Sequence, residues 1–142
     1  MVTSTLDLQK LAQKYNINLP ISNIVTKDKI REAIDYETNN KQFFIINLDS
    51  MDANFSGGTH WVALYINAKK SIAYYFDSFG IQPPEEIKNI FEIIGYNTFQ
   101  VQKIKSTLCG EYCIQFLNAL KHKDTLETYE NFINLFEDIK NR

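Results

Sequence analysis

The middle of the sequence contains two apolar runs that are separated by only four residues. The first run, HWVALYI, covers His60–Ile66, and the second, SIAYYF, covers Ser71–Phe76. Both are rich in β-branched and aromatic residues, which favour strands. Strands joined by so short a connection pair antiparallel, because a parallel pair needs a crossover of about a dozen residues. With a similar run at Gln42–Leu48, QFFIINL, the sequence predicts a small antiparallel sheet.

The apolar residues outside these runs mostly recur at helical spacing. Ser4 is predicted to cap a first helix that breaks at Pro20. Thr26 or Asp28 is predicted to cap a second helix that ends at Asn39–Asn40. The remaining predicted elements are a helix from Pro83–Pro84 to near Gly95, a strand over Thr98–Ile104, and helices over Leu108–Leu120 and Leu126–Ile139. The sequence therefore predicts an α+β fold with a small, mainly antiparallel sheet packed between helices.

The length and charge of the chain restrict the kinds of protein it can be. A chain of 142 residues fits one domain, with a helical N-terminal part (1–40), a central part (42–122) and a C-terminal helix (126–141). The formal net charge of −2 gives no basic excess, so we expect no direct nucleic-acid binding. No apolar run approaches the ~18 residues that span a bilayer, and the N-terminus lacks a secretory pattern. We therefore expect a reducing cell interior and no membrane.

One cysteine stands where a thiol can become reactive. Cys109 lies at the start of a predicted helix, where free N–H groups and the helix dipole favour a thiolate. His60 begins one strand of the hairpin and Asp77 follows the other, so strand pairing brings both to the same end of the sheet. There a carboxylate can orient an imidazole that acts as the base for a thiol. These three residues are candidate catalytic residues.

Two residues near this cysteine fit the same chemistry. Gln102 lies seven residues before Cys109, and its side-chain amide can donate to a developing oxyanion beside the Cys109 backbone N–H. Gly110 leaves room for an incoming backbone because it has no side chain. By contrast, Cys113 is predicted to be a packing residue. The spacing of the two cysteines also excludes a structural disulfide framework.

The order of these motifs resembles the adenovirus-type (adenain-like) cysteine proteases, in the same clan as the SUMO- and ubiquitin-like-protein-specific proteases. The motifs that carry the resemblance are GGTHW (57–61), FDSFG (76–80), Gln102 with Ser106, and CG (109–110) continuing into CIQFL (113–117). The matched stretch runs from about residue 42 to residue 120, most of the chain. The resemblance implies the adenain-type cysteine proteinase fold, with residues 42–122 as the catalytic core.

The resemblance also assigns a role to each candidate residue. It implies that Cys109 is the nucleophile and that His60 is the general base and acid. Asp77 is expected to orient His60, and Gln102 is expected to stabilise the oxyanion. The expected substrate-binding residues are Trp61, Gly58 and Gly110.

The relatives that look most similar are the capsid-maturation proteases of virophages, Maverick-type elements and large DNA viruses. The resemblance implies cleavage of viral capsid or other structural precursor proteins after small residues such as Gly-Gly during virion maturation. We expect these precursors as partners, a monomer, and a location in the virion and the host-cell cytoplasm (viral factory). The need for a peptide activator stays open, and a DNA activator is not expected because the chain has no basic excess.

Three alternatives remain beside this reading. The first is an isopeptidase of the same clan that acts on host ubiquitin-like modifiers. The second is an inactive peptide-binding module with the same fold; Glu111 favours it, because a carboxylate near the thiol opposes a low thiol pKa. The third is a zinc site formed by Cys109, Cys113, His60 and His122. The cysteine spacing is not typical of zinc sites, so we predict no metal and no other cofactor.

Overall fold

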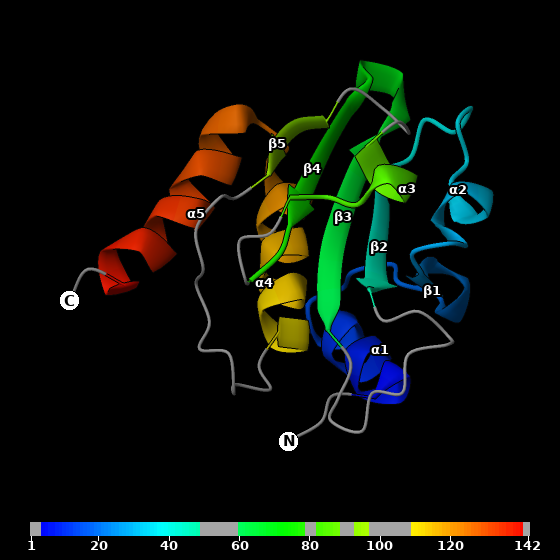
Figure 1. Ribbon diagram of the computed structural model, residues 1–142, viewed down its shortest axis with the longest axis horizontal. Coiled ribbons are helices and arrows are strands. Elements are labelled where there is room, and N and C mark those ends of the chain that lie inside the picture. Colours follow the sequence, from blue (N-terminus) through cyan, green and yellow to red (C-terminus); the bar gives the residue numbers. More distant parts are fainter. Residues whose placement is uncertain (1–3, 49–59, 79–81, 89–92, 97–108, 141–142) are drawn as a thin grey trace.

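The computed structural model describes residues 4–48, 60–78, 82–88, 93–96 and 109–140. Within these residues the chain forms a five-stranded sheet with helices on both faces (Figure 1). The elements, in chain order, are α1 (Thr5–Lys14), the 3-10 turn η1 (Ile21–Asn23), β1 (Ile24–Thr26), α2 (Ile30–Ala33), β2 (Gln42–Asn47), β3 (Trp61–Asn67), the 3-10 turn η2 (Ala68–Lys70), β4 (Ile72–Phe76), α3 (Glu85–Lys88), β5 (Ile93–Tyr96), α4 (Cys109–His122) and α5 (Leu126–Lys140). The predicted α+β class is confirmed.

The strands lie in the order β1-β2-β3-β4-β5, which is also their order in the sequence. The three central strands β2, β3 and β4 are antiparallel. Asn47 pairs with Trp61 across β2 and β3, and Ala63 lies opposite Phe76 across β3 and β4. The short edge strands β1 and β5 run parallel to β2 and β4. The sheet is therefore mainly antiparallel, as predicted, with a parallel strand at each edge.

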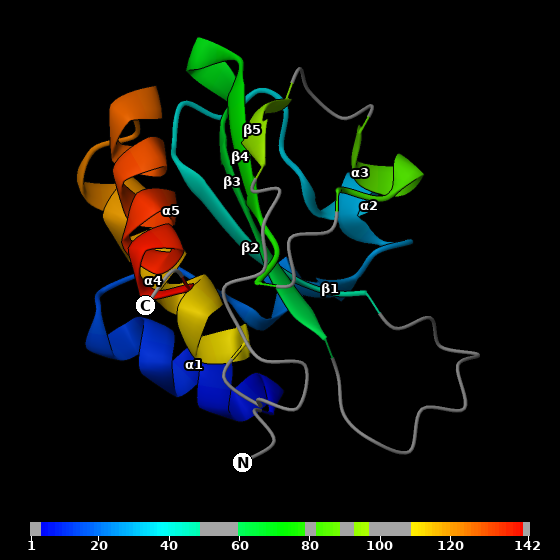
Figure 2. The same cartoon turned by 60° about the vertical axis from the view of Figure 1, so that its left-hand side comes forward.

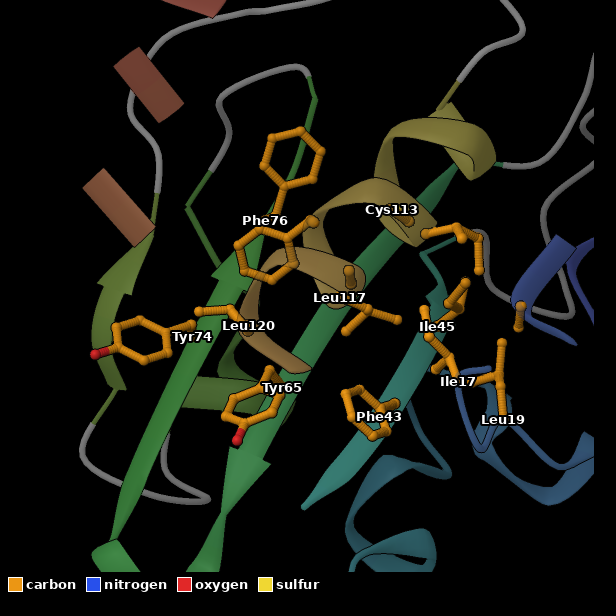
Figure 3. Close-up of a cluster of buried hydrophobic side chains, with 14 of the residues drawn as sticks. Ile17, Leu19, Phe43, Ile45, Tyr65, Tyr74, Phe76, Cys113, Leu117 and Leu120 are labelled. Atoms are coloured by element: carbon orange, nitrogen blue, oxygen red, sulfur yellow. The ribbon is translucent and has the colours of Figure 1, made fainter. Parts of the chain in front are cut away.

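Both faces of the sheet are covered, as Figure 2 shows: α1, α4 and α5 lie on one side, and α2 and α3 lie on the other. Nearly every residue of the three central strands is buried. Because side chains alternate between the two faces of a strand, this burial explains why the strands read as continuous apolar runs. The larger core lies between the sheet and α1, α4 and α5 (Figure 3). The smaller core joins the opposite face to Ile30 of α2 and Ile87 of α3.

Aromatic contacts hold α4 and α5 against the end of β4. Phe76 stacks on Phe116 of α4 with ring centroids 5.3 Å apart, and it meets Phe132 of α5 edge-on at 5.5 Å. Tyr74 stacks on Tyr129 of α5 at 5.1 Å. Each such pair contributes roughly 0.5–1.5 kcal/mol beyond the burial of its area. These contacts fix the last residue of β4, directly before Asp77.

The first predicted helix is confirmed together with its cap. The Asp7 backbone N–H donates to Ser4 Oγ at 3.1 Å, and the Ser4 backbone N–H donates to Asp7 Oδ2 at 3.1 Å. This reciprocal capping box satisfies two N–H groups that would otherwise lack partners within the helix. Leu8 and Ala12 then point into the larger core.

The second helix is much shorter than predicted, since α2 ends at Ala33 rather than at Asn39–Asn40. Lys29 occupies its N-cap position, so the predicted caps at Thr26 and Asp28 are wrong. Thr26 instead ends the unpredicted strand β1. Residues 1–40 therefore contain less helix than predicted, and they also contain a strand.

A contact with β2 explains why the second helix stops so early. The Asp35 backbone N–H donates to Gln42 Oε1 at 2.9 Å, and Gln42 Nε2 donates to the Asp35 carbonyl oxygen at 2.8 Å. This pair of hydrogen bonds engages both backbone groups of Asp35 outside a helix. The preceding residue, Ile34, is already extended, with ψ 132°.

The chain after β4 also differs in part from the prediction. The helix predicted to run to near Gly95 is described only as α3, and Gly95 itself lies in β5. It pairs with Tyr74 beside a register shift in the β4–β5 ladder. The strand predicted over Thr98–Ile104 lies outside the described residues. The two closing helices are confirmed, with ends within two residues of the prediction.

Asp124 ties the link between α4 and α5 to the turn of the β3–β4 hairpin. Its Oδ2 accepts hydrogen bonds from the Tyr65 hydroxyl at 2.6 Å and from Asn67 Nδ2 at 2.9 Å, and Lys70 Nζ lies 3.2 Å from Oδ1. Burial acts to raise the pKa of Asp124, but these three partners outweigh it and hold the pKa below its ordinary value. The carboxylate therefore remains charged inside the fold.

Candidate active site

The hairpin brings His60 and Asp77 into contact, as predicted. His60 directly precedes β3 and Asp77 directly follows β4, so the antiparallel pairing places both at the same end of the sheet. His60 Nε2 lies 2.7 Å from Asp77 Oδ1. The Asp77 side chain is fully buried, at 0% exposure, whereas 15% of the His60 side chain is exposed. The buried carboxylate of Asp77 thus contacts an imidazole that is still partly exposed to solvent.

This contact decides which nitrogen of His60 can take part in proton transfer. An ionised carboxylate only accepts hydrogen bonds, so the nitrogen facing it, Nε2, carries the proton. Nδ1 is then the nitrogen whose protonation can change during a reaction. The arrangement suits an imidazole that receives a proton at Nδ1 while Asp77 stabilises the resulting cation.

Cys109 is the first residue of α4, which confirms its predicted place at a helix start. In both views the first turn of α4 lies at the end of the sheet where β3 begins and β4 ends (Figures 1 and 2). The helix start and the His60–Asp77 pair are therefore at the same end of the fold. The Cys109 side chain itself lies outside the part of the chain that the structure describes.

The other predicted site residues are placed in different ways. Gly110 is buried at the start of α4. Trp61 is only 6% exposed and belongs to the larger core, so its predicted contact with substrate stays a prediction. Gln102 and Gly58 lie outside the described residues, and their roles also stay predictions. Glu111 is half-buried in the first turn of α4.

Cys113 packs into the larger core, as predicted, and also makes a polar contact that the sequence did not suggest. Its side chain is 0% exposed, and its Sγ donates a hydrogen bond to the carbonyl oxygen of Trp61 at 3.5 Å. A cysteine in an apolar helical stretch carries no signal for such a bond, because packing alone accounts for its residue type.

The described residues bring together no group of three His, Cys, Asp or Glu side chains suited to hold a metal ion. In the same part of the chain, no helix combines the length and the apolar character needed to cross a membrane. The groups that the structure describes at the site are a helix start with a cysteine and an imidazole paired with a carboxylate.

Comparison with known protein families agrees with this geometry. A model of the Ulp1 protease family, C-terminal catalytic domain, matches residues 8–131, a stretch that includes His60, Asp77 and Cys109. The chain belongs to this family. Membership in the Ulp1 protease family places the chain among the cysteine proteases and confirms the clan to which the sequence motifs pointed.

Viral proteases are among the relatives of this Ulp1-family chain. The protease of Human adenovirus B serotype 3 is 29% identical over 86 aligned positions, covering 47% of this chain and 41% of that protease. A crystal structure of the ASFV pS273R protease has a TM-score of 0.59 at 20% identity, covering 93% of this chain and 61% of that one. A second crystal structure of that protease has a TM-score of 0.54 at 16% identity. These structures share the fold, and the chain spans about two fifths of the adenovirus relative.

Proposed function

We propose that this domain is a cysteine endopeptidase that cleaves viral capsid or other structural precursor proteins during virion maturation. The observation that carries the proposal is the 2.7 Å contact between His60 and Asp77, at the end of the sheet where α4 begins with Cys109. The similarity to an adenovirus protease and to an ASFV protease supports the viral context. The proposed location is accordingly the virion and the cytoplasm of the infected cell.

The proposed reaction begins with proton transfer from the Cys109 thiol to His60 Nδ1. The thiolate attacks the carbonyl carbon of the scissile bond, and the carbonyl oxygen becomes an oxyanion. Gln102 and the Cys109 backbone N–H donate to this oxyanion. His60 then gives its proton to the leaving amine, which departs and leaves a thioester on Cys109.

Water completes the proposed cycle. His60 Nδ1 accepts a proton from a water molecule as its oxygen attacks the thioester carbon. The thiolate leaves, the acid product is released, and the proton on His60 restores the thiol. Asp77 stays ionised throughout and stabilises the imidazolium that forms twice in each cycle.

The proposed substrate has small residues, such as Gly-Gly, before the cleaved bond. Gly110, directly after the nucleophile, leaves space for the backbone of such a substrate. Trp61 and Gly58 are the other proposed substrate-binding residues. We propose that the domain acts as a monomer. The cleavage assay below tests whether it needs a peptide activator.

Cleavage kinetics test the proposed function. The purified protein is incubated with fluorogenic peptides that carry Gly-Gly directly before the leaving group. Peptides from the viral structural proteins are added in parallel reactions to test whether a peptide activator is needed. Turnover is expected for the unsubstituted protein, and none is expected for Cys109→Ala or His60→Ala. Equal turnover by Cys109→Ala and the unsubstituted protein would end the proposal.

A second candidate function is removal of ubiquitin-like modifiers, because the matching family is that of the Ulp1 protease. Such an isopeptidase needs a docking surface for a globular modifier in addition to the cleft. The two functions are separated by comparing kcat/KM for a ubiquitin or SUMO C-terminal fluorophore with kcat/KM for a short Gly-Gly peptide. A preference for the globular substrate by a factor of ~100 or more, equivalent to ~2.7 kcal/mol, would favour the isopeptidase.

A further inference from the structure

Cys113 joins the helix that begins with the proposed nucleophile to the strand that follows the proposed base. Its Sγ donates a hydrogen bond to the carbonyl oxygen of Trp61 at 3.5 Å. Cys113 lies one helical turn after Cys109, and Trp61 lies directly after His60. The bond therefore connects two positions that each lie close along the chain to a proposed catalytic residue.

The accepting carbonyl lies at an end of β3 where the strand extends beyond one of its ladders. Trp61 pairs with Asn47 of β2, whereas the ladder between β3 and β4 begins two residues later, at Ala63 opposite Phe76. A hydrogen bond from α4 adds a constraint at this end of the strand. The backbone of His60 runs directly into Trp61, and the His60 carbonyl oxygen accepts a hydrogen bond from the Leu48 N–H at 3.0 Å, so the chain after β2 and α4 both hold this end of the strand.

The packing around Cys113 makes this constraint rigid. Trp61 is 6% exposed, Ala63 is fully buried, and both belong to the same core as Cys113. Figure 3 shows Cys113 and Leu117 on the side of α4 that faces the strands. Cysteine is small enough to fit between a helix and a strand, and its S–H group is a weak hydrogen-bond donor. Alanine donates nothing and is smaller than cysteine, whereas serine keeps a donor at a similar size.

We propose that Cys113 is a positioning residue for catalysis: by holding the Trp61 carbonyl against α4, it fixes His60 relative to the start of that helix. The inference rests on the proposed roles of Cys109 and His60. Proton transfer between a thiol and an imidazole depends steeply on their separation, so a small displacement of His60 slows the reaction without removing a reacting group.

Three variants separate positioning from packing. Cys113→Ala removes the donor, and Cys113→Ser keeps a donor of similar size. Ile114→Val is the matched control, because Ile114 is the next residue of α4, is fully buried and lies in the same core. We expect Cys113→Ala to lower kcat roughly two- to ten-fold with little change in KM, and Cys113→Ser to regain most of the loss. Ile114→Val is expected to lower the thermal unfolding temperature while keeping kcat.

The pH dependence of Cys109 alkylation provides a second readout that packing does not move. The rate is followed by peptide mapping, so that labelling of Cys109 and Cys113 is separated. If His60 moves away from the helix start, the thiolate loses part of its stabilisation and the pH midpoint of alkylation rises. We expect this rise in Cys113→Ala, its reversal in Cys113→Ser, and an unchanged midpoint in Ile114→Val.

The outcomes distinguish failure of the inference from failure of the proposed function. If Cys113→Ala and Ile114→Val have the same kcat and the same pH midpoint, Cys113 only packs and the inference is wrong, while the proposed function stands. If Cys109 is alkylated at the same rate in the unsubstituted protein and in His60→Ala, the proposed function fails and the inference fails with it. Should Cys113→Ala not fold, Cys113→Val takes its place, since it fills the site without a donor.

Discussion

His60 Nε2 and Asp77 Oδ1 lie 2.7 Å apart, although 17 positions separate the two residues along the chain. The antiparallel register of β3 and β4 closes this separation, and the aromatic stack of Phe76 on Phe116 holds the end of β4 in place. The acid is fully buried and the imidazole is partly exposed. The buried Asp77 thus orients the imidazole, while the partly exposed side of His60 remains open to substrate.

Exchange of the acid for an amide tests whether Asp77 sets the tautomer of His60. Asp77→Asn presents an N–H group to Nε2, which favours the proton on Nδ1 and leaves that nitrogen unable to accept from a thiol. We expect kcat/KM for a Gly-Gly peptide to fall by roughly 10²–10⁴-fold while the protein remains folded. The measurement is steady-state kinetics beside thermal unfolding. A folded Asp77→Asn variant with full activity would show that Asp77 does not serve His60.

The hairpin was predictable from the sequence because its two strands are long apolar runs with a short connection. That pattern leaves one pairing direction, and it places residues 60 and 77 at one end whatever the rest of the fold does. Ser4 was predictable as a cap for a similar reason, because its partner Asp7 is only three residues away. Local chemistry decides both features.

The edges of the sheet and the end of α2 depend on distant residues, and the sequence does not predict them. β1 has three residues and β5 has four, and each exists because a neighbouring strand offers a parallel partner. The early end of α2 depends on the side chain of Gln42, seven residues beyond Asp35. The Trp61 contact of Cys113 spans 52 positions. A local sequence pattern does not predict contacts between residues that are far apart along the chain.

Removal of the proposed oxyanion donor should slow the chemical step. We expect Gln102→Ala to lose about 2.7–4 kcal/mol of transition-state stabilisation, seen mainly in kcat. The matched control is Gln115→Ala, because Gln115 is an exposed residue of α4. Equal kcat/KM for Gln102→Ala and Gln115→Ala would remove Gln102 from the proposed site.

Glu111 should weaken the thiolate that the start of α4 favours. It is half-buried in the first turn of the helix, and its negative charge opposes that of a thiolate at Cys109. We expect Glu111→Gln to lower the pKa of the Cys109 thiol and to raise its alkylation rate at pH 6.5 about three-fold.

Glu127→Gln is the matched control for this change, because Glu127 lies in the first turn of α5 and is exposed. It changes the net charge equally and should leave the alkylation rate of Cys109 as it is. If both variants raise the rate by the same factor, the effect belongs to the overall charge and not to Glu111.

Asp124 should stabilise the fold in a pH-dependent way. The pKa of Asp124 lies below the ordinary value of 3.8, so the folded state binds its proton less tightly than the unfolded chain does. The stabilisation is complete above pH ~4–5 and is lost as the pH falls through the lowered pKa of the folded state. We expect Asp124→Asn to reduce the free energy of unfolding by about 1–3 kcal/mol at pH 7 and by less at pH 3.

Urea unfolding at a series of pH values measures this difference. Tyr65→Phe is the companion variant, because it removes only the hydroxyl that donates to Asp124 at 2.6 Å and leaves the carboxylate in place. It should also lower stability at pH 7. A loss in Asp124→Asn that is as large at pH 3 as at pH 7 would show that the charge of Asp124 contributes nothing.

We propose that Cys109, His60 and Asp77 form one thiol protease site, and labelling of the nucleophile probes that site itself. The purified protein is treated at pH 7 with a Gly-Gly peptide that carries a thiol-reactive electrophile, and the adduct is located by intact mass and peptide mapping. We expect one adduct, on Cys109, that is lost in His60→Ala. Equal slow labelling of Cys109 and Cys113, unchanged in His60→Ala, would show that these three residues do not form a protease site.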